Sequence, residues 1–95
     1  MKISNKTTVV VADDIISCEL DGEAAILTMN DGIYYGLNPI GAKIWNLIQK
    51  PIKINEIISV IMKEYNVETE RCQIDIQTLI NDLLNHGLVK VNADT

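Results

Sequence analysis

The sequence predicts an α+β domain in which three short strands come first and three helices follow. Two observations carry this prediction. Residues 8–37 hold β-branched and apolar runs separated by Asp-Gly pairs, and residues 39–86 hold apolar stripes at helical spacing. Asp-Gly is a strong signal for a tight hairpin turn, because glycine adopts positive φ without strain. This order of elements is typical of a small sheet with helices packed on one face, and 95 residues fit a single domain.

The three strands are expected at residues 15–20, 23–29 and 33–37, as an antiparallel meander with tight turns between them. The third strand ends the meander, so we expect it at the edge of the sheet. An edge strand carries unpaired N–H and C=O groups that can pair with another strand.

Side chains alternate between the two faces of a strand. Ile33, Tyr35 and Leu37 should therefore share one face of the third strand, with Tyr34 and Gly36 on the other. Tyr35 is expected to point inward, whereas Tyr34 would report on a ligand if it faced solvent.

The three helices are expected at residues 39–49, 54–65 and 70–86. Asn38 can accept a hydrogen bond from a free amide at the start of the first helix, and Pro39 suits the first helical position. Apolar residues recur at i, i+3 and i+4 in the helices, as one buried face requires. The flanking residues 8–12 and 88–91 could each form a short strand or an extended segment.

The net charge of −5 argues against a nucleic-acid-binding protein, since phosphate contacts need a basic surface. It also weakens the case for an anionic membrane surface. Residues 68–86, which hold the third helix and its start, contain four acids against a single base (Glu68, Glu70, Asp75 and Asp82 against Arg71). That helix would repel phosphate, and we expect neither nucleic acid nor membrane as a partner.

The residues needed for catalysis do not come together in the sequence. Cys18 and Cys72 form no CxxC pair and no zinc spacing, and we expect two buried or half-buried thiols. His86 is the single histidine, and it is fourteen residues from Cys72 on one predicted helix. We therefore expect no enzyme activity, no metal and no cofactor. Without an apolar signal segment, the chain is expected to be cytoplasmic with reduced thiols.

An ordered set of short motifs resembles the PqqD-like family of peptide-binding modules, also called RiPP recognition elements. These motifs are Gly22-Glu23-Ala24-x-Ile26-Leu27, Gly32-x-Tyr34-Tyr35-x-Leu37-Asn38, Gly41-Ala42-x-Ile44-Trp45, Glu56-Ile57-Ile58, Asp75-Ile76-x-x-Leu79 and Gly87-Leu88-Val89. The likeness covers residues 8–91, the expected ordered core, and is greatest to the stand-alone modules of lasso-peptide clusters. It implies a winged helix-turn-helix arrangement of these elements.

The resemblance also implies a binding mode, in which a leader peptide adds as a strand between the third strand and the third helix. One wall of that site would be Ile33, Tyr34, Tyr35 and Leu37; the other would be Cys72, Asp75, Ile76 and Leu79, with Arg71 near the mouth. Several of these residues have a plainer interpretation. The aliphatic ones could be core, Asp75 could interact with its own helix dipole, and Arg71 could be a solvated surface residue.

The implied function is to bind the leader of a ribosomally made precursor peptide and deliver it to processing enzymes. In lasso-peptide biosynthesis these would be a leader peptidase and an ATP-dependent macrocyclase, acting in trans. An acidic protein–protein adaptor or regulator that uses the same strand edge is the alternative, and a DNA-binding winged helix ranks below it. A precursor gene and a cyclase gene nearby would favour leader binding.

Overall fold

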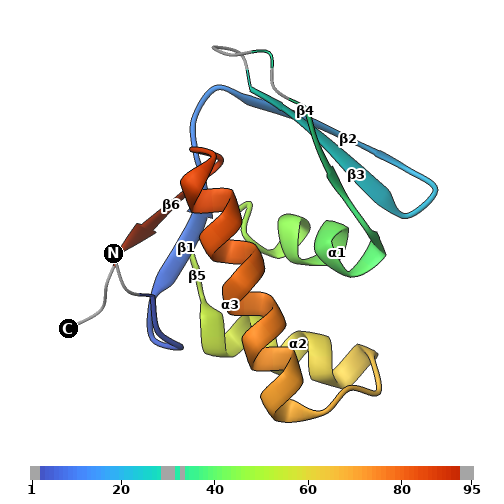
Figure 1. Cartoon of the computed structure of the whole chain (residues 1–95), viewed down its shortest axis with the longest axis vertical. Coiled ribbons are helices and arrows are strands. Elements are labelled where there is room, and N and C mark those ends of the chain that lie inside the picture. Colours follow the sequence, from blue (N-terminus) through green and yellow to red (C-terminus); the bar gives the residue numbers. More distant parts are fainter. Residues whose placement is uncertain (1–2, 29–31, 33, 93–95) are drawn as a thin grey trace.

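The computed structural model describes residues 3–28, 32 and 34–92 (Figure 1). In chain order the elements are β1 (Thr8–Val11), β2 (Ile15–Leu20), β3 (Glu23–Thr28), β4 (Tyr34–Leu37), α1 (Pro39–Leu47), β5 (Ile52–Lys53), α2 (Ile54–Glu64), α3 (Thr69–Asn85) and β6 (Val89–Asn92). The predicted α+β class, with a three-stranded antiparallel sheet followed by three helices, is confirmed. The arrangement is compatible with a winged helix-turn-helix description. Ile33 and Met29, both expected in strands, lie outside the described residues.

The predicted meander is the antiparallel sheet β2-β3-β4. Its first turn follows the Asp-Gly signal, because Asp21 and Gly22 both have positive φ, 54° and 81°. This is the backbone that a two-residue hairpin turn with the twist of the strands requires. In the register, Leu27 pairs with Ile16 on one side and with Tyr34 on the other. The sheet therefore has β2 and β4 as its two edges.

A second antiparallel sheet, ordered β5-β1-β6, joins the two ends of the chain. Thr8 pairs with Asn92 and Val11 with Val89, so both segments of uncertain structure in the sequence are strands. Figure 1 shows this sheet on the left, with α3 lying between it and the β2-β3-β4 sheet. The sequence analysis did not predict this pairing.

The helices begin within one residue and end within two residues of the expected positions. The Asn38 side chain accepts a hydrogen bond from the Gly41 amide at 2.8 Å, so the predicted cap of α1 is confirmed. Lys53 is the N-cap residue of α2. His86 is the C-cap of α3, and Gly87 follows with a φ of 73°, the left-handed conformation that glycine adopts readily.

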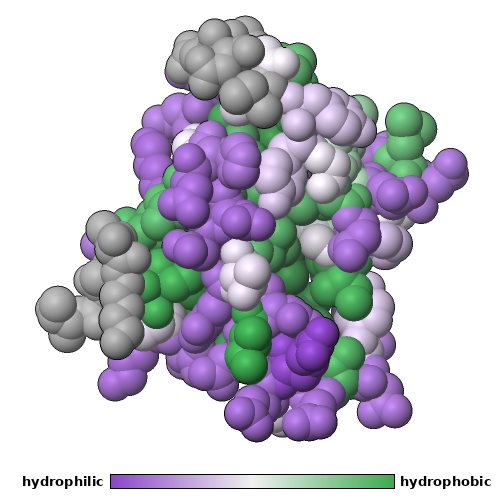
Figure 2. Space-filling model, in the orientation of Figure 1, coloured by the Kyte–Doolittle hydropathy of each residue, from purple (hydrophilic) through white to green (hydrophobic). Residues whose placement is uncertain are grey.

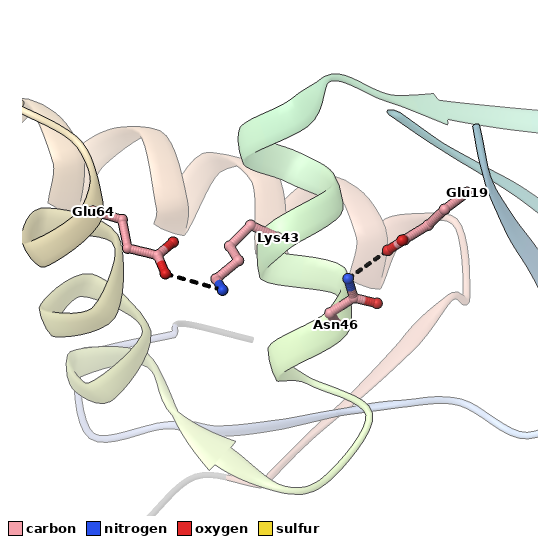
Figure 3. Close-up of polar contacts among 4 residues, drawn as sticks. All are labelled: Glu19, Lys43, Asn46 and Glu64. Atoms are coloured by element: carbon pink, nitrogen blue, oxygen red, sulfur yellow. Dashed lines mark hydrogen bonds and ion pairs between the residues drawn. The ribbon is translucent and has the colours of Figure 1, made fainter. Parts of the chain in front are cut away.

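The core is aliphatic and lies between the helices and the inner faces of the two sheets. Its largest fully buried side chains are Trp45, Ile26, Ile44, Ile48, Ile54, Ile57, Ile80, Leu83, Leu88 and Val9. Polar contacts tie α1 to its neighbours: Lys43 pairs with Glu64 of α2 at 3.1 Å, and the Asn46 amide donates to Glu19 of β2 (Figure 3). These contacts lie on a different face of α1 from the buried Gly41 and Ile44, so the helix is held on two sides.

Candidate functional site

Strand β4 has one edge without a neighbouring strand. Among the described residues it pairs with β3 alone, through Ala24 to Leu27. Alternate N–H and C=O groups of an edge strand point away from the sheet and are available to another chain. The expectation that the last strand of the meander lies at the sheet edge is confirmed.

A groove of about 280 Å³ lies beside this strand. It is lined by β4 (Tyr35, Gly36, Leu37), by the start of α1 (Asn38, Ile40, Gly41, Ile44) and by α3 (Asp75, Leu79). Figure 2 shows apolar residues reaching the surface in the middle of this face of the molecule, with hydrophilic residues around them. The groove therefore has strand backbone on one side and a helix on the other, and both apolar and polar side chains line it.

Close packing at one end of the groove depends on Gly41. A Cβ atom at this position would lie 3.2 Å from the Leu37 side chain and 3.3 Å from the capping oxygen of Asn38. Contacts this short would require the neighbouring side chains to shift by a few tenths of an ångström. Glycine thus leaves room for the strand to turn directly into the helix.

Tyr35, which lines the groove, packs against His86, the residue that follows α3. The rings of Tyr35 and His86 meet edge to face, with their centroids 5.3 Å apart and their planes at 68°. His86 Nδ1 lies 2.8 Å from the Asp82 carbonyl oxygen, which holds the imidazole at the end of α3. Burial, and then the charge of Asp82, raise the pKa of the Tyr35 hydroxyl. The sequence did not show that His86 and Asp82 lie near Tyr35, because only the tertiary fold brings the end of α3 to β4.

The expected α3 residues divide between groove and core. Asp75 and Leu79 line the groove, whereas Cys72 and Ile76 are buried beneath it. Burial, with a smaller effect of the Asp75 charge, raises the pKa of the Cys72 thiol. Arg71 is exposed and lies 3.3 Å from the Asp75 carboxylate, so it borders the site as that carboxylate's partner.

Tyr34 lies on the opposite face of β4 and is 70% exposed. Its ring extends over Gly36, where an added Cβ would contact it at 3.6 Å. With Ile16 and Leu27 it forms an apolar row across the three strands of the sheet. Tyr34 therefore does not line the groove, and it can meet only those side chains of an added strand that face outward.

The thiol expectation is confirmed for Cys72 and wrong for Cys18, which is exposed. The alternation of β2 directs Cys18 to the outer face of the sheet, which no helix covers. Within residues 3–28, 32 and 34–92, no group of three or more His, Cys, Asp or Glu residues is placed to hold a metal ion. No helix in the same part of the chain is long and apolar enough to cross a membrane.

A family model described as coenzyme PQQ synthesis protein D (PqqD) matches residues 23–89, which span β3 to the start of β6 and include every described residue of the groove. The chain belongs to the PqqD family. This confirms the resemblance found in the sequence motifs. No curated protein matches this PqqD-family chain by sequence.

Two solved structures are similar to the whole fold. One is TbiB1 in complex with the TbiA(beta) leader peptide, with 29% sequence identity and a TM-score of 0.81, over 90% of this chain and 99% of that one. The other is lasso peptide synthetase B1 complexed with its leader peptide, with 22% identity and a TM-score of 0.77, over 86% and 96% of the two chains. The PqqD-family fold described above thus recurs over nearly the whole length of both of these chains.

Proposed function

We propose that this protein captures the leader of a ribosomally made precursor peptide by strand addition to β4 and presents it to processing enzymes. The observation that carries the proposal is the unpaired edge of β4 beside the groove. The solved structure with 29% identity and nearly full coverage is itself a complex with a leader peptide, which supports the same kind of ligand here.

The proposed mechanism divides affinity from specificity. Backbone hydrogen bonds to β4 would hold any extended peptide, and the groove would select side chains. Tyr35, Leu37 and Leu79 offer apolar contact on the inner side, and Asp75 offers a carboxylate that can accept a hydrogen bond. Cys72 and Ile76 act indirectly, because their burial fixes the position of α3.

The groove supports capture better than chemistry. His86 packs edge to face with Tyr35, and Cys72 is a buried thiol whose raised pKa disfavours the nucleophilic thiolate. We propose a non-catalytic role in which the bound leader is handed in trans to a leader peptidase and to an ATP-dependent macrocyclase of lasso-peptide biosynthesis. Tethering would raise the effective concentration of the substrate at each enzyme. Ordering a disordered leader would cost about 2–5 kcal/mol of the gross interaction energy.

A fluorescence-anisotropy titration tests capture. The probe is the labelled leader encoded by the precursor gene nearest this gene, with labelled duplex DNA in parallel. Saturable leader binding without DNA binding is expected, because α3 presents Glu70, Asp75 and Asp82 against Arg71 alone. No binding by protein shown to be folded would refute the proposal.

Strand addition can be separated from other modes with two N-methylated leaders. N-methylation removes the backbone donor of a residue without changing its side chain. One leader carries it at alternate residues, and the other carries it at the residues between. Because only every second amide of an added strand faces β4, one of the two leaders should lose affinity and the other should retain it. Equal affinity of both would exclude backbone pairing to β4.

A further inference from the structure

Asp82 lies on the groove side of α3, in its last turn. Taking about 100° per residue, Asp75, Leu79 and Asp82 fall within about 60° of one another around the helix. Asp75 and Leu79 line the groove. The carbonyl oxygen of Asp82 lies 2.8 Å from Nδ1 of His86, whose ring packs on Tyr35 of β4. Asp82, which is exposed, therefore lies near the Tyr35 end of the groove.

An acid at this position conflicts with the local rules for helices. The C-terminal end of a helix carries partial negative charge, which disfavours carboxylates and favours cations. The last turn of α3 holds no basic residue, and among the described residues the Asp82 carboxylate has no ion-pair partner. Local conflicts of this kind are expected at functional sites.

We propose that Asp82 selects leaders with a lysine or arginine side chain at the strand position facing the Tyr35 end of the groove. This inference rests on the proposed function. Strand addition would place an inward-facing peptide side chain over Tyr35, and a long cationic side chain there reaches the carboxylate. The cation would also interact favourably with the helix end and with the face of the Tyr35 ring.

The charges around the groove also favour a positively charged ligand. Arg71, the single base of α3, is engaged by Asp75 at 3.3 Å, so it is a weak receptor for an acidic leader. The net charge of −5 attracts cationic peptides at long range and speeds their association. A basic leader segment therefore matches both the groove and the whole chain.

The test is a double-mutant cycle on the intact protein. The probe is the labelled leader of the nearest precursor gene, with copies in which each lysine or arginine is changed singly to glutamine. The protein variant is Asp82→Asn, and Glu70→Gln is the matched control. Glu70 is exposed on the same helix, about 120° around the axis and ~18 Å along it from Asp82. Both variants remove one negative charge, so they change long-range attraction equally.

We expect Asp82→Asn to weaken leader binding about two- to fivefold, the range for a partly exposed ion pair. Glu70→Gln should change it less. One glutamine leader should bind wild type and Asp82→Asn equally well, which identifies the paired cation, and added salt should reduce the difference between the two proteins. The inference is overturned if both variants behave alike, if no lysine or arginine couples to Asp82, or if the bound leader contains neither residue. Each of these outcomes leaves leader capture standing, whereas wild-type protein that binds no leader removes both proposals.

Discussion

Replacing Leu83 with alanine tests the orientation of α3, on which one wall of the groove depends. Leu83 is fully buried, with 0% of its surface exposed, and belongs to the single core cluster. The substitution removes three carbon atoms and leaves a cavity that the neighbours fill only in part. Substitutions of this kind cost about 2–5 kcal/mol, against a total of about 5–15 kcal/mol for a natural domain.

The matched control is Leu20→Ala, the same chemical change at a side chain that is 72% exposed on the outer face of the sheet. Its free energy of unfolding should change by less than about 0.5 kcal/mol. For a domain of this size each kcal/mol moves the melting temperature by about 4–8 °C. Leu83→Ala should therefore melt at least about 8 °C lower than wild type.

Thermal and urea unfolding can be followed by the fluorescence of Trp45, which is the single tryptophan and is buried in the core. Circular dichroism on the same samples checks that unfolding is two-state. If Leu83→Ala and Leu20→Ala shift the midpoint equally, the described face of α3 is wrong and the groove residues Asp75 and Leu79 would not face β4.

Further predictions concern the groove and its ends. Asn38→Ala removes the cap of α1 and should lower the free energy of unfolding by about 1 kcal/mol, measured by urea denaturation. Asp75→Ala and Tyr34→Ala should each weaken leader binding in a titration and leave the melting temperature within about 2 °C of wild type; unchanged affinity would remove that residue from the site. Burial and Asp82 raise the pKa of Tyr35, so the unfolded chain loses this proton first as pH rises. The stability that this pKa difference provides is complete below about pH 10 and is lost above it. Between pH 8 and 11 the urea midpoint of Tyr35→Phe should therefore fall less than that of wild type. Equal falls in the two proteins would contradict this.

Local sequence signals were sufficient to predict the meander and the positions at which the helices start. The Asp21-Gly22 pair alone predicts its turn, and both residues adopt the positive φ that the turn requires. Asn38 and Pro39 fix the start of α1, since a capping side chain followed by a residue without an N–H is specific to a helix N-terminus. These signals act within four residues, which is why one sequence suffices to interpret them.

The second sheet could not be predicted in the same way. Residues 8–11 and 89–92 pair across nearly the whole chain, and β5 has two residues, too few to show any periodicity. Pairing over such a separation depends on how α3 packs, which no local pattern contains. The exposure of Cys18 also depends on packing between distant segments, because no helix in the described part of the chain covers the outer face of β2.

The candidate site was predicted in part. Alternation along β4 separates Tyr35 from Tyr34, and the structure agrees with it. The sequence could not show that Asp82 and His86 lie near Tyr35, because this proximity depends on how the end of α3 packs against β4. Which peptide side chains contact the groove stays a prediction.

Amide hydrogen exchange with and without the precursor leader tests strand addition to β4 most directly. The account predicts that binding slows exchange of the β4 amides that point away from β3, over Tyr34–Leu37, and leaves exchange at β5 and β6 unchanged. Protection confined to another surface, or leader binding without any change in β4, would contradict it.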